Sequence, residues 1–226
     1  MKVLLVNPLT KYNAWAAPDL RFAYLSSSLK SSGHLTSLLD CVNNGYSFGK
    51  FEEFIKEKDF DVVGFKVFST DIPSVKKSIS IVRKNRPDAV IVIGGHHSSA
   101  FPEQSLQYFD EADYAFRGEA ECGLKDLVNN LSNLHERILE KVPGLIWRKP
   151  GKIICNPPVF VEDLDSLDPP DWELIEPDRY FFQTSYFTKS KIVAPLFMTR
   201  GCAYGCTFCS SRSVTGRRTR SHSATY

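Results

Sequence analysis

Three cysteines lie close together near one end of this 226-residue chain. Cys202, Cys206 and Cys209 form the spacing C-x3-C-x2-C within the stretch TRGCAYGCTFCSSR. Thiolates at this spacing, in a loop that also contains Gly201 and Gly205, are able to converge on one small cluster, and iron-sulfur clusters are held chiefly by cysteine thiolates. With three local ligands, one iron of such a cluster would keep an open coordination position.

Two other roles for these cysteines stay open on the residues alone. A closed structural zinc site needs four ligands, and the nearest histidine, His222, follows the last of the three cysteines by thirteen residues. A redox disulfide would use two of the cysteines and leave the third without a role. An iron-sulfur cluster uses all three, and we favour that interpretation.

The composition is that of an ordinary globular protein, with 42% hydrophobic and 24% charged residues. The longest apolar run, AVIVIGG at 89–95, is far shorter than the roughly 20 residues that span a bilayer. The opening MKVLLVNP lacks the cleavage site of a signal peptide. We therefore expect a cytoplasmic protein without a membrane span, where disulfides are rare. The scattered cysteines are expected to be ordinary packed or half-buried thiols: Cys41, Cys122 and Cys155.

Charge is distributed unevenly along the chain. Residues 191–226 contain six Lys or Arg and no Asp or Glu, although the formal net charge of the whole chain is only +2. A basic tail is a feature of nucleic-acid-binding proteins, but an anionic cofactor beside the cysteines accounts for these arginines equally well. We expect no nucleic-acid partner and keep RNA binding as an alternative raised by four residues: Arg212, Arg217, Arg218 and Arg220.

The first 130 residues alternate between strand-like and helix-like segments. Short apolar runs predict strands at 2–8, 35–42, 62–69, 89–95 and 112–119. Apolar residues at helical spacing predict helices at 19–34, 47–59, 72–85, 102–110 and 121–133. Strands separated by helices predict the α/β class, with a doubly wound parallel five-stranded sheet and helices on both of its faces.

In such sheets, ligands bind beyond the carboxyl ends of the strands. The residues expected there are Asn7, Pro8, Asp40, Ser69, Thr70, Gly94 to His97 and Arg117 to Glu119. Because Gly94 and Gly95 have no Cβ, the backbone is able to come close to a bulky ligand; a tight turn is the simpler alternative. His96 and His97 are adjacent and cannot easily chelate one metal together, so we expect surface or packing roles for them.

The later part of the chain has a different character. Residues 141–190 are rich in proline and predict an extended, turn-rich linker with at most one hairpin, around Pro150 and Gly151. After it, APLFMTR at 194–200 predicts a short strand, and the cysteines follow on the loop at its carboxyl end. The expected organisation is a domain at 1–140, a linker at 141–190 and the start of a second domain at 191–226.

The cysteine motif, with Phe208 just before the last cysteine and a basic loop after it, resembles the cluster motif of radical S-adenosylmethionine (SAM) enzymes. The resemblance implies that Cys202, Cys206 and Cys209 hold three irons of a 4Fe-4S cluster, whose fourth iron binds SAM. It implies that the backbone of Phe208 lies near the adenine. It further implies an external electron donor such as flavodoxin or ferredoxin, and a 5'-deoxyadenosyl radical that abstracts hydrogen from a small-molecule substrate.

The order of a doubly wound domain, a Pro-rich linker with DLDSLDPPDWELI and a cysteine loop resembles the cobalamin-binding subclass of radical SAM enzymes over essentially the whole chain. The stretches GGHHSSAFPE and RGEAE stand where that subclass has its typical motifs. The resemblance implies cobalamin as a cofactor, with Thr70, Gly94 and Gly95 facing its nucleotide tail. Many cobalamin domains carry a cobalt-binding histidine after the first strand, but this chain has no histidine before His34.

The resemblance implies the N-terminal part of a cobalamin-dependent radical SAM enzyme, for methyl transfer or a related, cyclase-like transformation of a small molecule. Residues 191–226 would then be the first strand and cluster loop of a partial TIM barrel, truncated, so we expect the fragment alone to be inactive. One alternative is a non-catalytic corrinoid-binding module with a vestigial cysteine loop. Another is an RNA-modifying radical SAM enzyme.

Overall fold

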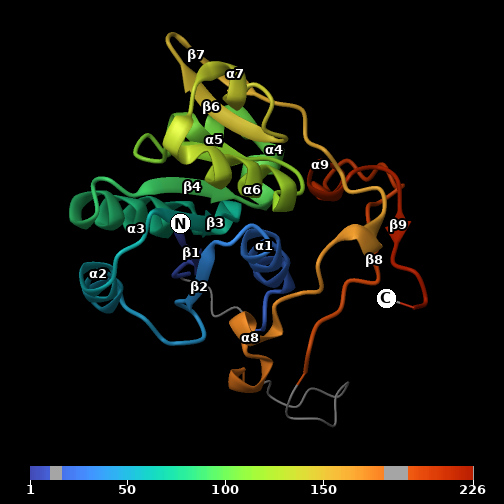
Figure 1. Ribbon diagram of the computed structural model, residues 1–226, viewed down its shortest axis with the longest axis horizontal. Coiled ribbons are helices and arrows are strands. Elements are labelled where there is room, and N and C mark those ends of the chain that lie inside the picture. The colour runs from blue at the N-terminus through green and yellow to red at the C-terminus, as the bar shows by residue number, and fades with distance from the viewer. Residues whose placement is uncertain (11–16, 181–192, 226) are drawn as a thin grey trace.

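The computed structural model describes residues 1–10, 17–180 and 193–225. Its main feature is a seven-stranded sheet with the order β2-β1-β3-β4-β5-β6-β7 (Figure 1). The first five strands pair in parallel and are β1 (Lys2–Asn7), β2 (Leu35–Asp40), β3 (Val62–Lys66), β4 (Val90–Gly94) and β5 (Tyr114–Phe116). The predicted parallel five-stranded sheet is therefore confirmed.

Most of the helices connect these strands and cover both faces of the sheet, while the last two lie in the predicted linker and in the cysteine loop. They are α1 (Leu20–Lys30), α2 (Phe48–Glu57), α3 (Ile72–Asn85), α4 (His96–Ala100), α5 (Pro102–Tyr108), α6 (Glu121–Asn130), α7 (Glu136–Leu139), α8 (Trp172–Ile175) and α9 (Ser211–Thr215). The short helix α4 was not predicted, whereas α1, α2, α3, α5 and α6 were. Within the described ranges, every helix is too short or too polar to cross a bilayer.

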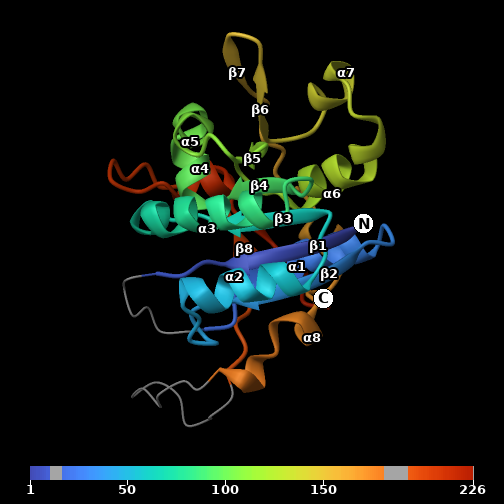
Figure 2. The same cartoon turned by 90° about the vertical axis from the view of Figure 1, so that its left-hand side faces the viewer.

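The alternation of side chains along β1 supplies two hydrophobic cores. Leu4 and Val6 pack in one core with α2, α3 and α5, while Val3 and Leu5 pack in the other with α1, α6 and α8. Figure 2 looks onto one face of the sheet, with α2 and α3 in front of the stacked strands. Strands buried on both faces in this way read as continuous apolar runs, which is why they were visible in the sequence.

The helix starts follow ordinary capping chemistry. The Asp19 carboxylate accepts a hydrogen bond from the Arg21 backbone N–H at the start of α1, and the Ser47 hydroxyl accepts one from the Lys50 N–H at the start of α2. Both side chains satisfy backbone donors that have no partner inside the helix. Pro73 stands in the first turn of α3, where a missing N–H costs nothing.

A hairpin extends the sheet beyond the predicted five strands. β6 (Leu145–Lys149) pairs antiparallel with β5 and with β7 (Lys152–Cys155). Gly151, at φ +76°, lies in the turn between them, as predicted. Because Ile146 and Trp147 are buried in the cores, this stretch of the predicted linker belongs to the sheet itself.

The strand predicted at 194–200 is shorter in the structure. Only β8 (Thr199–Arg200) forms, and it pairs antiparallel with β9 (Arg220–Ser221). A strand needs a neighbour for its backbone hydrogen bonds, and the neighbour here contributes two residues. The cysteines follow β8 directly, as predicted, and the β8–β9 pair closes the base of their loop.

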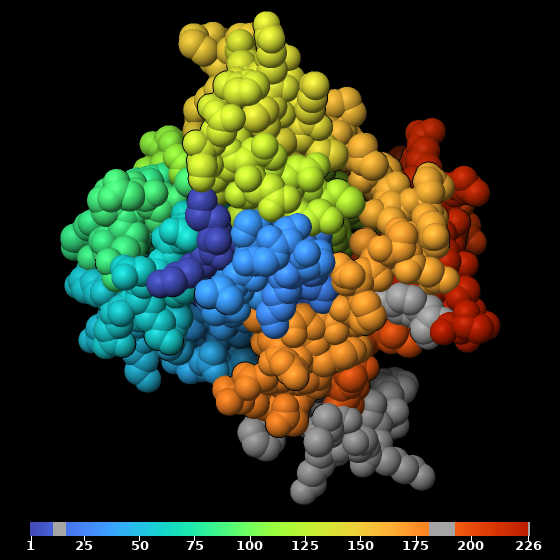
Figure 3. Space-filling view, in the orientation of Figure 1, coloured from blue at the N-terminus to red at the C-terminus, as the bar shows by residue number. Residues whose placement is uncertain are grey.

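Linker residues around Asp171 pack on α1. The Asp171 carboxylate accepts hydrogen bonds from the Ser26 hydroxyl at 2.5 Å and the Lys30 ammonium at 2.6 Å, while the Ser27 hydroxyl donates to the Pro169 carbonyl at 2.6 Å. In the space-filling view the orange linker lies directly against the blue surface of α1 (Figure 3). The described residues of the linker around Asp171 are therefore held against α1.

Candidate functional site

A cavity of about 870 Å³ lies beyond the carboxyl ends of β1, β3, β4 and β5. Eight of the residues that were expected at this edge line its wall: Asn7, Pro8, Thr70, Gly94, Gly95, His96, Gly118 and Glu119. Other parts of the wall come from the start of α1, from residues between Pro195 and Cys202, and from α9. Asp40, also expected at this edge, instead accepts a hydrogen bond from the buried Tyr180 hydroxyl at 2.8 Å.

Gly95 brings bare backbone to the edge of the cavity. Its φ is +107°, and a Cβ built there would lie 3.1 Å from the Val67 carbonyl oxygen and 3.3 Å from the Val67 nitrogen. A side chain would therefore meet both a strained backbone conformation and a close neighbour. The tight turn leaving β4 is confirmed, and it is open on the cavity side.

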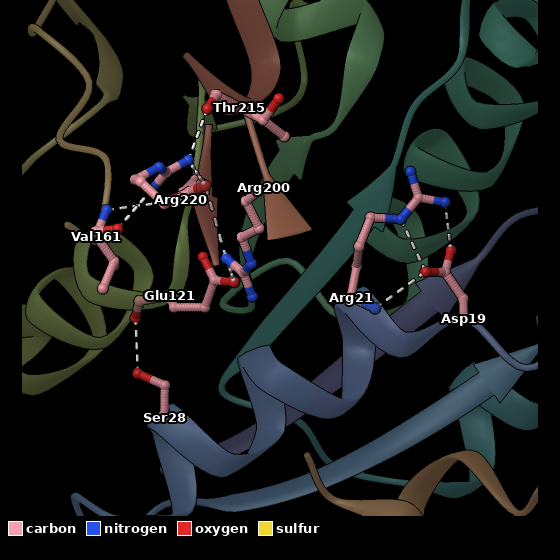
Figure 4. Close-up of polar contacts among 9 residues, drawn as sticks. Asp19, Arg21, Ser28, Glu121, Val161, Arg200, Thr215 and Arg220 are labelled. Atoms are coloured by element: carbon pink, nitrogen blue, oxygen red, sulfur yellow. Dashed lines mark hydrogen bonds and ion pairs between the residues drawn. The ribbon is translucent and has the colours of Figure 1, made fainter. Parts of the chain in front are cut away.

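Three charged side chains form a network in the cavity wall. Arg21 donates two hydrogen bonds to the Asp19 carboxylate, each at 2.8 Å, and the Lys66 ammonium lies 3.0 Å from the same carboxylate. Burial alone would raise the pKa of Asp19, but the Arg21 and Lys66 cations outweigh it and hold that pKa well below its usual value. The network therefore holds the Asp19 carboxylate between two cations, and Figure 4 shows its Arg21 side.

His96 joins this network as a neutral imidazole that accepts a hydrogen bond. An Arg21 Nη lies 3.2 Å from His96 Nδ1, and because a guanidinium only donates, Nδ1 must accept and Nε2 must carry the proton. Burial lowers the pKa of His96, and the Arg21 and Lys66 charges lower it further. Its ring stacks on Phe68 with centroids 4.8 Å apart, which confirms the expected packing role.

Replacing Asp19 with asparagine is expected to destabilise the protein by about 2–3 kcal/mol at pH 7, because it removes a buried carboxylate that is bonded to the part-exposed Arg21 and the mostly buried Lys66. The folded-state pKa lies below the ordinary value, so the stabilisation is fully present above about pH 4 and is lost as the pH falls further. Urea denaturation at neutral and acidic pH checks this. Asp59→Asn, at an exposed Arg86 pair, is the control and should cost at most about 1 kcal/mol. A difference in the free energy of unfolding between Asp19→Asn and the unaltered protein that does not change with pH would contradict the low pKa of Asp19.

The three predicted cysteine ligands lie on one loop but face two cavities. Cys202 lines the large cavity, while Cys206 and Cys209 line a second one of about 430 Å³. Its wall also contains three arginines: Arg117, Arg212 and Arg217. Across the described ranges, no group of three or more His, Cys, Asp or Glu side chains is arranged to hold a metal. The shared iron cluster thus stays a prediction. Phe208 is 91% exposed and is not part of either wall, and its SAM contact also stays a prediction.

The cysteines outside the loop differ chemically from those in it. Cys41 is buried, and Cys122 and Cys155 are half-buried. Burial raises the pKa of all three, that of Cys41 to about 12. In the loop, a hydrogen bond with the Ser211 hydroxyl lowers the pKa of Cys209. Thiolates are the form that binds metals, so the predicted packing role of the scattered cysteines is confirmed.

Several residues of the large cavity were not predicted from the sequence. Asp19, Arg21 and Lys66 reach the cavity from a helix cap, the first turn of a helix and the end of a strand. A capping Asp followed by Arg is common in surface helices, so the pattern gave no sign of a site. Position at the carboxyl edge of β3 was the one available signal for Lys66.

A family model described as the B12 binding domain matches residues 16–128, which is half of the chain. The chain belongs to the B12-binding domain family. The matched range contains most of the parallel sheet and all three residues predicted to face cobalamin. The large cavity is therefore at the carboxyl edge of the B12-binding domain, and the resemblance found in the sequence is confirmed.

Curated relatives extend beyond the B12-binding domain. An uncharacterized methyltransferase of Pyrococcus horikoshii is 29% identical over 99% of this chain and 48% of its own length. The anaerobic magnesium-protoporphyrin IX monomethyl ester cyclase of Rubrivivax gelatinosus is 30% identical over 93% of this chain and 38% of its own length. The chain thus spans about half the length, or less, of the curated relatives it matches.

Solved structures share the fold. The radical SAM methyltransferase TsrM of Kitasatospora setae, with cobalamin and a 4Fe-4S cluster bound, matches with a TM-score of 0.73 and 21% identity, over 98% of this chain and 43% of TsrM. The cobalamin-dependent SAM radical enzyme OxsB, with aqua-cobalamin and SAM bound, matches with a TM-score of 0.78 and 22% identity, over 98% of this chain and 30% of OxsB. The likeness covers the sheet, the linker and the cysteine loop alike.

Proposed function

We propose that this chain is the cobalamin-binding and cluster-bearing part of a cobalamin-dependent radical SAM enzyme of the cytoplasm. The reaction is a methyl transfer to a small molecule, or a related radical transformation. One observation carries the proposal: a single cavity is walled both by the strand ends of the B12-binding domain and by Cys202 of the C-x3-C-x2-C loop. Relatives with methyltransferase and cyclase names support the reaction class.

The residues in the cavity wall fit these cofactors. Gly95 offers close backbone approach where a Cβ would be crowded, and the wall is largely apolar, as is usual for cofactor sites. The cysteine loop offers three thiols, the donor type that iron-sulfur clusters require. When bound, the cluster supplies the electron that cleaves SAM, and cobalamin supplies a cobalt that carries the transferred group.

The residues of this chain bind and orient the two cofactors. In this proposal the thiolates of Cys202, Cys206 and Cys209 bind iron, and Thr70 with Gly94 and Gly95 faces the cobalamin tail. His96 lines the cavity and is held in place by Arg21 through its Nδ1. Because Cys206 and Cys209 are exposed, an external donor such as flavodoxin or ferredoxin would reach the loop from its outer side.

The test uses the full-length protein, reconstituted anaerobically with iron, sulfide and cobalamin. We expect co-purifying cobalamin, iron-sulfur absorbance and reductive cleavage of SAM. Zinc, or no metal, at the three cysteines would overturn the proposal. Cobalamin binding without SAM cleavage would instead favour the non-catalytic corrinoid module.

RNA modification gains no support from the arginines that suggested it. Arg220 is buried against Glu119, and Arg212 and Arg217 line the second cavity beside the cysteines. Arg218 is 81% exposed and pairs with Glu162 at 3.1 Å. Three of the four side chains therefore lie in the interior or beside the proposed cluster ligands, and the fourth makes an ion pair on the surface. No observation favours an RNA partner over a small-molecule substrate.

Gly95→Ala is expected to weaken cobalamin binding about tenfold or more and to cost about 1–3 kcal/mol of stability, because the new Cβ meets the Val67 backbone at a positive φ. Gly151→Ala is the matched control, since Gly151 has φ +76° and no atom within 4 Å of its Cβ position. It should show the stability cost alone. Cobalamin titration followed by absorbance separates the two, and equal affinity in both variants would contradict the placement.

A further inference from the structure

Two arginines at the base of the cysteine loop are buried against two glutamates of the B12-binding domain (Figure 4). An Arg200 Nη lies 2.7 Å from a Glu121 oxygen, and Arg220 reaches both oxygens of Glu119, at 2.7 and 2.9 Å. All four side chains are less than one tenth exposed. We call these residues the clamp.

The clamp holds both ends of the loop at once. Arg200 and Arg220 face each other in the register of β8 and β9, so they bracket residues 201–219, which include all three cysteines of the motif. Both glutamates come from the few residues between β5 and the first turn of α6. The loop is therefore fastened at its base to one short stretch of the sheet edge.

Further contacts tie the linker into the same point. Arg220 donates to the carbonyls of Val161 and Thr215, both at 2.6 Å, and the Val161 N–H donates to Glu119 at 3.0 Å. The Arg200 guanidinium also lies over the Tyr24 ring of α1, 4.7 Å from its centroid. Linker, loop and α1 therefore converge on the clamp.

The physical character of the clamp suits positioning more than stability. Two charges of each sign are removed from water, so the attraction is largely offset by desolvation, and such groups are best explained by the one arrangement they allow. The two-pronged Arg220–Glu119 pair also fixes orientation as well as distance. Glu119, Glu121 and Arg200 line the large cavity themselves, so any shift of the clamp changes the spacing across it.

We propose that Glu119 and Glu121 are positioning residues, which lock the cysteine loop onto the carboxyl edge of the B12-binding domain and so set the distance between the two halves of the cavity. The catalytic meaning of this lock rests on the proposed function. The lock itself needs neither cofactor. It would keep the cluster side and the cobalamin side of the cavity at one separation through a reaction cycle.

Hydrogen exchange followed by mass spectrometry on the full-length, cofactor-free protein tests the lock. Glu119→Gln and Glu121→Gln are expected to speed exchange in residues 199–221 about 100-fold, as for loss of a buried partner, while β1, β3 and β4 stay unchanged. Glu162→Gln is the matched control. It removes the carboxylate that Arg218 meets at 3.1 Å, in a pair that is 81% and 66% exposed, and is expected to change exchange less than about twofold.

Unchanged exchange in both clamp variants would overturn the proposal, and so would a uniform rise across the whole sheet. If Glu119→Gln fails to fold by circular dichroism, Glu121→Gln decides, because it removes the short Arg200–Glu121 pair and leaves the Arg220 pair and the longer Arg200–Glu119 contact at 3.8 Å. In protein loaded with both cofactors, the magnetic broadening of the Co(II) signal by the reduced cluster should weaken in the variants while metal content is retained. Wild-type protein that binds no cofactor would sink the proposed function and leave the exchange result standing.

Discussion

Replacing Cys202 with alanine in the full-length protein is expected to remove its iron-sulfur absorbance and its SAM cleavage together. Cys202 is the first of the three thiols and the one that lines the large cavity. With two cysteine ligands in place of three, one iron of the cluster is left without its protein ligand. The loss should exceed the about 100-fold effect of removing an outer partner of a metal ligand. Iron content and the yield of 5'-deoxyadenosine are the measurements, and Cys206→Ala and Cys209→Ala should behave alike.

Cys122→Ala is the control for this change. It removes one thiol in the same way, but from a half-buried side chain whose pKa burial raises. Iron content and SAM cleavage should match the unaltered protein, with a stability change of about 1 kcal/mol. If Cys202→Ala kept its iron, or if Cys122→Ala lost it, the assignment of the motif as the ligand set would be wrong.

The parallel sheet could be predicted because its signals are local. Strands such as Val90–Gly94 are buried on both faces and therefore read as unbroken apolar runs, and the helices between them carry an apolar stripe. Placement of Thr70, Gly94 and Gly95 at one cavity followed from topology alone, because the carboxyl ends of parallel strands share an edge. The order of strands and helices along the chain was therefore enough to predict at which edge of the sheet the site lies.

Features that depend on distant pairing could not be predicted. The hairpin at Leu145–Cys155 joins the sheet only because β5 offers it an edge; the Pro-Gly turn indicated a hairpin but not its pairing with β5. The clamp joins Arg200 to Glu121 and Arg220 to Glu119, across 79 and 101 residues. The residues of RGEAE and of the arginine-rich loop do not indicate which of them pair. A charged residue has the same sequence signal whether it faces solvent or a buried residue of opposite charge.

The geometry of the cysteine loop could not be predicted from the sequence either. The motif specifies that three thiols are available, and their spacing allows them to converge. It does not specify the backbone of the loop, and the structure places Cys202 at one cavity and Cys206 with Cys209 at another. The residue that determines how the loop leaves the sheet is the glycine just before the motif.

Gly201→Ala is expected to open the base of the cysteine loop and to lower the iron content of the full-length protein severalfold. Gly201 follows β8 at φ +99°, and a Cβ there would overlap the Arg218 carbonyl oxygen and lie 2.7 Å from its carbonyl carbon. Backbone atoms cannot rotate away as a side-chain end does, so the strands must separate. Strain and overlap together should cost roughly 3 kcal/mol.

The separation would act directly on the clamp, because Arg200 precedes Gly201 and Arg220 lies opposite in the register. Exchange in residues 199–221 should therefore rise as it does for Glu121→Gln, and iron content should fall with it. Gly33→Ala supplies the comparison, since Gly33 has φ +80° and no atom within 4 Å of its Cβ position. The stability cost of Gly33→Ala should be about 1–2 kcal/mol, as for a residue in the left-handed region, and the iron content should be unchanged. Equal iron content in the two variants would mean that the cysteine loop tolerates movement at its base. The β8–β9 pair would then mark the boundary of the loop without supporting it.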